Sequence, residues 1–396
     1  MIVKNEVENL PRCLASVRGL VDEMIVLDTG STDGTVELAR SLGAQVEHFA
    51  WCDDFSQARN VALEYVTGDW VLVLDADEVW RSQATVDIRL LIDRPEVLVI
   101  NLIRQEIGAV QSPYSLVSRL FRRHEGIYFQ RPYHAMIDDS VEVLLKTEPN
   151  WQILQLETCA IDHYGYTLEA IQSQGKHAKA RKMMEGFLAK HPDDPYVCSK
   201  LGALYIEMGE IDRGINLLNQ GLQAKNIDPN TTYELHYHLA ETYQKQQQLQ
   251  QSFDHYQTAI AQPIFPQLKL GALNNLATLL QDNNQLAEAE VLYKEVLAID
   301  PNLAIAHYNL GILYRSQNNF VGAIEHYEIA IGLTPDNPNL HQNLGVVLMK
   351  VGQVPESLEA FGRAIVLHGG SEEGERLRQT LGEMGFAIDP IATDMQ

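Results

Sequence analysis

Residues 70–78 read WVLVLDADE, an apolar run that ends in three acidic side chains, Asp75, Asp77 and Glu78. A continuous apolar run of this kind is typical of a strand that helices cover on both faces of a sheet. The carboxylates at its end repel one another, whereas a divalent cation between their oxygens turns that repulsion into binding. The stretch therefore predicts a buried strand of an α/β domain with a metal site at its end. An acidic turn that simply ends the strand is the alternative.

The first 165 residues alternate strand and helix patterns, as α/β domains do. Short apolar runs indicate strands at 1–3, 23–28, 44–49, 70–75, 97–104 and 116–123. Helical spacing of apolar residues is found at 8–20, 35–43 and 55–66. In an open α/β sheet, ligands bind beyond the carboxyl ends of the strands, where EMIVLD and WVLVLD both place an aspartate. We therefore expect a Rossmann-like sheet with its ligand site at these aspartates.

The second half of the chain carries a repeat. Leu276, Leu310 and Leu344 lie 34 residues apart, and aromatic residues recur behind them at 293, 327 and 361. This period is that of the tetratricopeptide helix-turn-helix unit, which buries its apolar face on its neighbours. Two looser units begin near residues 201 and 239. We expect an α/β domain at 1–165, a connecting helical segment at 166–195, about five repeats at 196–370 and a capping helix with a tail at 371–396.

Composition narrows the range of partners. The formal net charge is −23 and the pI about 4.9, which disfavours binding to nucleic acid or to anionic membrane surfaces. The four cysteines are scattered without zinc-site spacing. No apolar run approaches the roughly 20 residues of a membrane span. We expect a cytoplasmic protein with reduced thiols.

Four sequence blocks together resemble the family 2 glycosyltransferases of the GT-A fold. They are VKNE (3–6), LDTGSTDGT (27–35), FSQARN (55–60) and WVLVLDADE (70–78). Their order and approximate spacing are similar to those of the family, and the repeats resemble those of a bacterial subset. The resemblance implies an enzyme that moves a sugar, with inversion, from a nucleoside diphosphate donor, with a UDP-sugar expected. A Mn²⁺ or Mg²⁺ ion would bridge the diphosphate.

The resemblance also implies roles for individual residues. The family's nucleotide-contacting positions fall here on Ile2, Lys4, Asp28, Arg59 and Asp75. The two aspartates of the DxD element, Asp75 and Asp77, would be metal ligands, with Glu78 unassigned.

The later part of the domain departs from the family pattern. In RPYHAMIDD (131–139), His134 is followed by Ala135, where the family usually has Glu. If that Glu is the acceptor's base, Asp138 or Asp139 would have to replace it. In IDHYGY (161–166), His163 is a candidate third metal ligand or phosphate contact, and a purely structural histidine is the alternative. Arg119 has two readings as well, a diphosphate or acceptor contact or a solvated strand residue.

The first strand is expected to be short. Family members normally begin this strand several residues earlier, and here only MIVKN is present. Either the sequence begins at an internal methionine or this member tolerates the loss, and in both cases we expect a weakened sheet.

The repeats suggest a binding groove. Asn275, Asn309 and Asn343 precede the recurring leucines and would form a ladder of amides able to grip a peptide backbone. Asparagine as a merely frequent polar choice is the alternative. A protein or peptide acceptor fits such a groove, and a glycan or lipid-linked acceptor stays open.

Two other functions compete with glycosyl transfer. One is a non-catalytic repeat scaffold with a decayed catalytic domain. The other is sugar-nucleotide synthesis, which would need a glycine-rich basic loop after the first strand, and VKNEVENLPR is not one.

Overall fold

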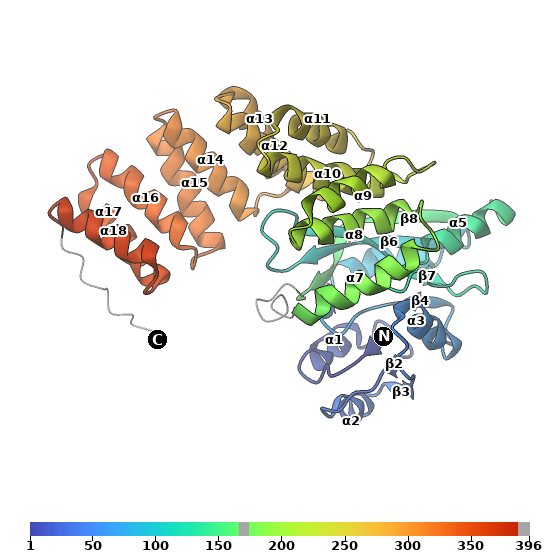
Figure 1. Cartoon of the computed structure of the whole chain (residues 1–396). Coiled ribbons are helices and arrows are strands. Elements are labelled where there is room, and N and C mark those ends of the chain that lie inside the picture. Colours follow the sequence, from blue (N-terminus) through green and yellow to red (C-terminus); the bar gives the residue numbers. More distant parts are fainter. Residues whose placement is uncertain (166–173, 387–396) are drawn as a thin grey trace. The chain divides into compact units, whose positions relative to one another are not determined.

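The computed structural model describes residues 1–165 and 174–386 (Figure 1). The remaining parts of the expected connecting segment and tail, 166–173 and 387–396, lie outside the described residues. The chain divides into two compact units, Met1–Thr242 and Tyr243–Gln396. The first unit holds the α/β domain together with the first helices of the repeat region.

A small parallel sheet forms the amino-terminal part of the first unit. Its strands are β1 (Ile2–Val3), β2 (Ile25–Asp28) and β3 (Gln45–His48), in the order β1-β2-β3. The covering helices are α1 (Leu10–Val17), α2 (Thr35–Ser41) and α3 (Phe55–Glu64). Helix α2 packs on β3, and α3 packs on β1 and β2. These elements confirm the alternation predicted from the apolar runs.

The larger sheet is mixed rather than parallel. Its order is β4-β7-β6-β8-β5. The strands are β4 (Trp70–Leu72), β5 (Glu78–Trp80), β6 (Val97–Glu106), β7 (Tyr114–Arg122) and β8 (Gln152–His163). Strand β6 runs antiparallel to β7, which follows it directly in the chain, and parallel to β8. Helix α4 (Ala84–Ile92) packs on β8. Helix α5 (Asp138–Thr147) precedes β8 in the chain.

The predicted short first strand is confirmed. Within the described residues, β1 has two residues and pairs only with β2, and β4 pairs only with β7. The α/β domain is therefore built on two sheets instead of one continuous sheet. Apolar clusters join the layers, and Leu74 and Trp80 pack with Cys13 and Val17 of α1.

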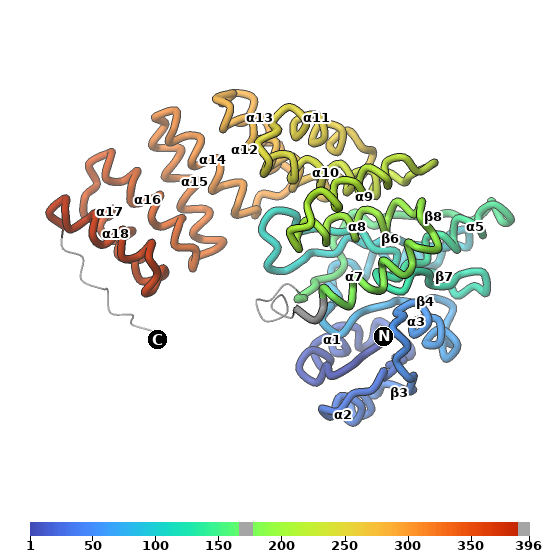
Figure 2. The backbone as a smooth tube through the Cα atoms, in the orientation of Figure 1, coloured from blue at the N-terminus to red at the C-terminus, as the bar shows by residue number. Residues whose placement is uncertain are grey.

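Antiparallel helix pairs build the repeats (Figure 2). Helix α7 (Gln174–Leu188) precedes the pairs, which are α8/α9 (Pro195–Glu207, Ile211–Gly221), α10/α11 (Pro229–Lys245, Leu249–Ile260), α12/α13 (Leu270–Asp282, Leu286–Ile299), α14/α15 (Ala304–Ser316, Phe320–Leu333) and α16/α17 (Pro338–Lys350, Val354–His368). A short 3₁₀ helix (Pro266–Lys269) precedes α12, and α18 (Glu372–Glu383) follows the last pair.

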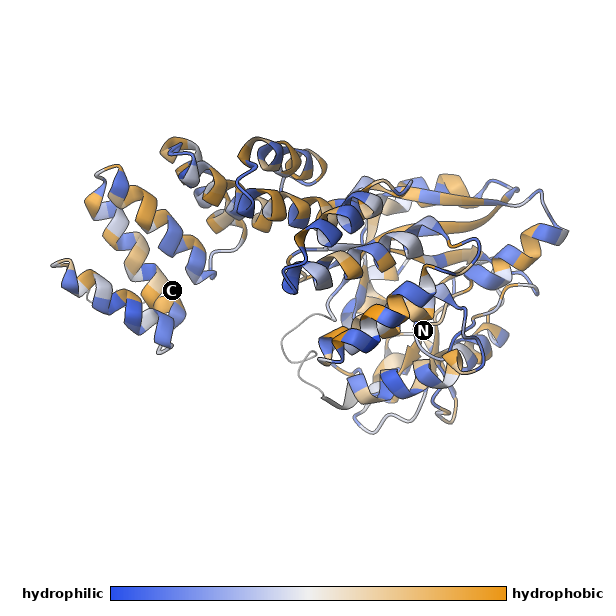
Figure 3. Ribbon diagram, turned by 45° about the horizontal axis from the view of Figure 1, so that its top comes forward, coloured by the Kyte–Doolittle hydropathy of each residue, from blue (hydrophilic) through white to orange (hydrophobic). Residues whose placement is uncertain are grey.

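In the last two repeat pairs, a glycine on the first helix packs against an aromatic ring on the second. A Cβ placed on Gly311 would lie 2.6 Å from the Tyr327 ring, and one on Gly345 would lie 2.9 Å from Phe361. Tyr293 and Tyr327 are fully buried at the aromatic positions that recur in the sequence. Along these helices apolar and polar residues are interspersed (Figure 3), and some apolar side chains, such as Val321 on α15, are exposed.

Candidate active site

Asp75 lies just beyond β4 and forms ion pairs with two arginines. Its Oδ1 is 2.9 Å from Arg59 Nη2 on α3, and its Oδ2 is 2.8 Å from Arg119 Nη2 on β7. Burial alone would raise the pKa of Asp75, but Arg119 and Arg59 hold it far below its ordinary value. Arg119 is accordingly a buried partner of the DxD element and not a solvated strand residue. Arg59, predicted to contact the nucleotide, lies on the carboxylate of Asp75.

Glu78 is the buried centre of the acidic cluster. Its side chain is fully buried and accepts hydrogen bonds from Arg104 Nη1 at 2.7 Å and Arg119 Nη1 at 2.8 Å. The backbone N–H of Asp75 donates to its Oε2 at 2.9 Å, which closes the turn. Arginines on β6 and β7 therefore offset the repulsion between these acids. Sequence analysis assigned no role to Glu78. No motif around Glu78 identifies Arg104 as its ion-pair partner.

Asp77 and His163 form the second part of the cluster. Asp77 Oδ2 is 3.3 Å from His163 Nε2, at the end of β8. The other ring nitrogen, Nδ1, is 2.5 Å from Glu106 Oε2. Burial alone would lower the pKa of His163, but Asp77 and Glu106 raise it to about 9. Gly165 follows closely, and a Cβ there would lie 2.5 Å from His163 Nε2 and 3.0 Å from Asp77 Oδ2.

These residues can accommodate a hard divalent cation, with two ligands from the chain. Within the described residues, no three His, Cys, Asp or Glu side chains converge, because Asp75 faces the arginines. Asp77 and His163 do converge, and the missing side chain of Gly165 leaves space beside both. Magnesium-type ions commonly take one or two protein ligands and complete their shell with substrate phosphates and water. A carboxylate on the far nitrogen of the histidine, as Glu106 provides, is usual at metal sites.

Of the predicted nucleotide-contacting residues, Asp28 ends β2 and Lys4 follows β1, whereas Ile2 is the first residue of β1. Ile2 packs against Leu27 and Ala58, and Lys4 is exposed just beyond β1. Asp28 is buried and accepts the backbone N–H groups of residues 30 and 31 at 3.1 Å. Its Oδ2 is 3.4 Å from His48 Nδ1. Asp28 and His48 line a polar pocket of about 490 Å³ at the amino terminus of α2.

The two candidate bases have different surroundings. Asp139 forms an ion pair with the buried Arg131, which also contacts Asp194 at the amino terminus of α8. Asp138 is exposed, and its Oδ1 accepts a hydrogen bond from Ser118 at 2.8 Å. Ser118 precedes Arg119 on β7. The β7 residue that Asp138 contacts is therefore next in sequence to Arg119, the partner of Asp75. Of the two carboxylates, Asp138 is the more open to an acceptor.

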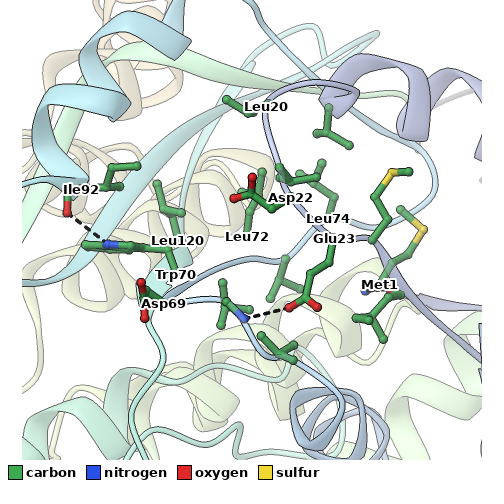
Figure 4. A pocket seen from close by; sticks show the side chains of 18 of the residues that line it. Met1, Leu20, Asp22, Glu23, Asp69, Trp70, Leu72, Leu74, Ile92 and Leu120 are labelled. Atoms are coloured by element: carbon green, nitrogen blue, oxygen red, sulfur yellow. Dashed lines mark hydrogen bonds between the residues drawn. The ribbon is translucent and has the colours of Figure 1, made fainter. Parts of the chain in front are cut away.

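A second pocket, of about 630 Å³, lies at the amino-terminal ends of β2 and β4 (Figure 4). Leu20, Glu23 and Leu72 line it together with Trp70, whose indole N–H donates to the carbonyl oxygen of Ile92 at 3.1 Å. Neither aspartate of the DxD element is among its lining residues. Ile2 and Arg59 do line it, and Arg59 is the ion-pair partner of Asp75, so the pocket reaches the edge of the carboxylate cluster.

The asparagines of the predicted ladder make contacts between successive repeats. Asn309 Nδ2 donates to Asn274 Oδ1, and Asn343 Nδ2 donates to the hydroxyl of Tyr308, each at 3.1 Å. Asn275 is buried within α12. These side chains therefore help to fix neighbouring helices, and a role in gripping a peptide stays a prediction.

The α/β domain has an Asp-Ala-Asp turn after a buried strand, and helical repeats follow it in the chain. This combination is typical of a class of transferases. The sequence model described as Glycosyl transferase family 2 matches residues 1–154. Models of tetratricopeptide repeats match residues 172–230, 279–317 and 313–352. The chain therefore belongs to the family 2 glycosyltransferases, in a form that carries tetratricopeptide repeats.

Two relatives and one solved structure are similar to all or part of this chain. A TPR repeat-containing protein of Synechococcus elongatus is 44% identical over 390 residues, which cover 98% of this chain and 97% of that protein. The SPbeta prophage-derived glycosyltransferase SunS of Bacillus subtilis is 28% identical over 202 residues, 49% of this chain and 46% of SunS. This chain thus matches about half the length of SunS. A crystal structure of MamA protein, 19% identical, aligns with 50% of this chain and all of that chain at a TM-score of 0.38.

None of the helices in residues 1–165 and 174–386 is long and apolar enough to cross a bilayer.

Proposed function

We propose that this glycosyltransferase takes its sugar from a nucleoside diphosphate donor, with a UDP-sugar as the first choice, and uses Mn²⁺ or Mg²⁺. The observation that carries the proposal is the convergence of Asp77 Oδ2 and His163 Nε2 beside Gly165. A divalent cation at this point would offset the negative charge that develops on the leaving diphosphate. The acidic chain as a whole repels phosphates, so a local positive centre is needed to bind such a donor.

The chain's own residues would divide the work around the donor. Asp77 and His163 would hold the cation, and Asp75, whose two oxygens pair with Arg59 and Arg119, would take the family's position beside the ribose. Ile2, Lys4, Asp28 and Arg59 take the family's nucleotide-contacting positions. The two arginines would keep the Asp75 carboxylate in one position. Such precision matters because a misplacement of about 1 Å near a reacting centre costs about 100-fold in rate.

Asp138 is the proposed base for the acceptor. It is exposed, and its hydrogen bond from Ser118 occupies only one carboxylate oxygen. It contacts Ser118 of β7, the strand that also carries Arg119, the partner of Asp75. Removal of the acceptor's proton by Asp138 would allow attack at the anomeric carbon on the face opposite the leaving diphosphate, which inverts that centre. Asp139 instead neutralises Arg131.

The repeats are proposed to bind the acceptor or a partner protein. Tetratricopeptide stacks present extended surfaces for peptides. A protein or peptide acceptor is the proposed class, with a glycan as the second choice. The cytoplasm, where nucleotide-sugars are made, is the proposed compartment.

Calorimetry with UDP and MnCl₂ tests the donor and metal together. Wild type is expected to bind UDP at least about tenfold more tightly with Mn²⁺ than without it, and Asp77→Asn is expected to lose that gain. Asp193→Asn, an exposed aspartate of the same unit, is the matched control and should behave as wild type. Absence of Mn²⁺-dependent UDP binding in the wild type would contradict the proposal and favour the scaffold. Hydrolysis of a panel of sugar nucleotides would then identify the sugar.

A further inference from the structure

A row of buried and half-buried side chains with alternating charge connects the two aspartates of the DxD element. In order of contact, its members are Arg59, Asp75, Arg119, Glu78, Arg104, Glu106, His163 and Asp77. The row includes residues of β5, β6, β7 and β8 and begins beside the end of β4, so it reaches all five strands of the larger sheet. Glu106 and Arg104 belong to none of the motifs that identify the family, yet they stand between the two ends of the row.

The register of the sheet places Glu106 beside the histidine. Strand β6 runs parallel to β8 with Glu106 opposite His163, and β5 runs antiparallel to β8 with Glu78 opposite the same histidine. His163 therefore lies between two acidic residues on neighbouring strands. Arg104, two residues before Glu106, lies on the same face of β6 because side chains alternate along a strand. Its Nη1 is 2.7 Å from Glu78 Oε1.

Both oxygens of Glu106 are occupied, which fixes the plane of its carboxylate. Oε1 accepts from Arg104 Nε at 2.9 Å and from Ser115 Oγ at 2.5 Å. Oε2 is 2.5 Å from His163 Nδ1. An ionised carboxylate only accepts hydrogen bonds, so His163 Nδ1 must carry a proton. The remaining nitrogen, Nε2, lies 3.3 Å from Asp77 Oδ2 and faces the position proposed for the cation.

We propose that Glu106, held by Arg104, is a positioning residue that fixes the ring of His163 so that Nε2 faces Asp77. The inference deepens the proposed function and rests on it, since its purpose is the cation that Asp77 and His163 would share. Such partners of a ligating histidine typically contribute 10-fold to 100-fold in metal affinity. Arg104 acts through Glu106 and, by its contact with Glu78, ties the same framework to the turn that holds Asp75.

Titration of the protein with Mn²⁺ in the presence of UDP, followed by electron paramagnetic resonance of the free ion, measures this contribution. Glu106→Gln keeps the size of the side chain but removes its charge and one acceptor. We expect its Mn²⁺ affinity to fall by about 10-fold to 100-fold, with metal-free UDP binding unchanged. Glu96→Gln, a surface glutamate paired with Arg94, is the matched control and should keep the wild-type affinity.

The outcomes separate this inference from the proposed function. If wild type binds no Mn²⁺, the proposed function fails. If wild type binds Mn²⁺ and Glu106→Gln binds it equally well, only the positioning role is overturned. A measurement on the wild type covers the case in which the variant does not fold. Nitrogen NMR of the metal-free wild type, at a pH where the ring is found to carry a single proton, should show that proton on Nδ1 of His163, and a proton on Nε2 instead would overturn the inference.

Discussion

Gly165→Ala is the sharpest single perturbation of the candidate metal site. The added Cβ would lie 2.5 Å from His163 Nε2, 2.8 Å from its Cε1 and 3.0 Å from Asp77 Oδ2. A ligating nitrogen holds a metal at about 2.0–2.1 Å, so a carbon this close to both ligand atoms occupies the position that the ion needs. We expect Mn²⁺ affinity to fall at least about 100-fold, the upper end of what a displaced partner of a ligand costs.

The cost of this substitution to folding should be similar in size to its effect on the metal, so stability has to be measured separately. Gly165 does not have a left-handed backbone, so alanine fits the main chain. Moving the histidine ring aside is an overpacking cost of about 1–3 kcal/mol, partly offset by the lower entropy of the unfolded alanine chain. Gly186→Ala on α7, where an added Cβ meets nothing within 4 Å, is the matched control.

Two measurements on the same samples decide the matter. Urea unfolding without metal checks that Gly165→Ala is folded, and Mn²⁺ titration with UDP measures the site. The control should keep wild-type affinity and gain up to about 1 kcal/mol in stability, as an alanine in a helix does. A folded Gly165→Ala that binds Mn²⁺ as tightly as wild type would show that the ion lies elsewhere, and the assignment of Asp77 and His163 would be wrong.

Three further predictions concern stability. Arg131→Ala leaves the two carboxylates that it bridges without their buried cation, so urea unfolding should show a loss of about 3 kcal/mol, and an unchanged value would refute the bridge. In the second unit, His307 Nδ1 and His326 Nδ1 are 2.8 Å apart, and burial, followed by His307, lowers the pKa of His326 below its ordinary 6.5. The folded unit therefore favours neutral His326, so its stability should be complete above about pH 6.5 and fall as the pH drops below it. Urea midpoints at pH 5 and 7.5 should show this, and His326→Asn should flatten the dependence; a wild-type midpoint that does not move would contradict it. Gly311→Ala should cost about 1–3 kcal/mol in thermal melts because its Cβ meets the facing tyrosine ring, whereas Gly332→Ala, with open space around it, should not destabilise; equal losses would refute the packing argument.

The fold was accessible from the sequence because its signals are local. The apolar runs that end in Asp28 and Asp75 predicted β2 and the strand before the DxD turn, and the 34-residue period predicted the helix pairs. The mixed order of the larger sheet was not accessible. Strand β8 inserts between β6 and β5 although a helix and long loops separate it from both in the chain. Such pairings depend on tertiary packing, which a pattern of apolar residues does not specify.

The sequence nominated the candidate-site residues that stand in motifs, but not the residues that hold them in place. Asp75, Asp77 and His163 stand in motifs, so the sequence could nominate them. Arg104 and Glu106 reach them only through strand register, across 26 and 57 residues of sequence. A single sequence carries no mark of these pairings, and both side chains read as ordinary polar residues near the end of a strand.

The charges around the DxD turn explain how acids can crowd there and still bind an anionic donor. Arg59, Arg119 and Arg104 neutralise Asp75, Glu78 and Glu106, so these pairs contribute little net charge. What remains is Asp77 beside His163, whose pKa of about 9 keeps a proton on the ring near neutral pH. A divalent cation bound there would displace that proton from Nε2, because a histidine binds metal in its deprotonated form. The exchange of one positive charge for two leaves the site one unit more positive. The metal, and not the acidic cluster by itself, would therefore turn this corner of the protein into a site for a diphosphate.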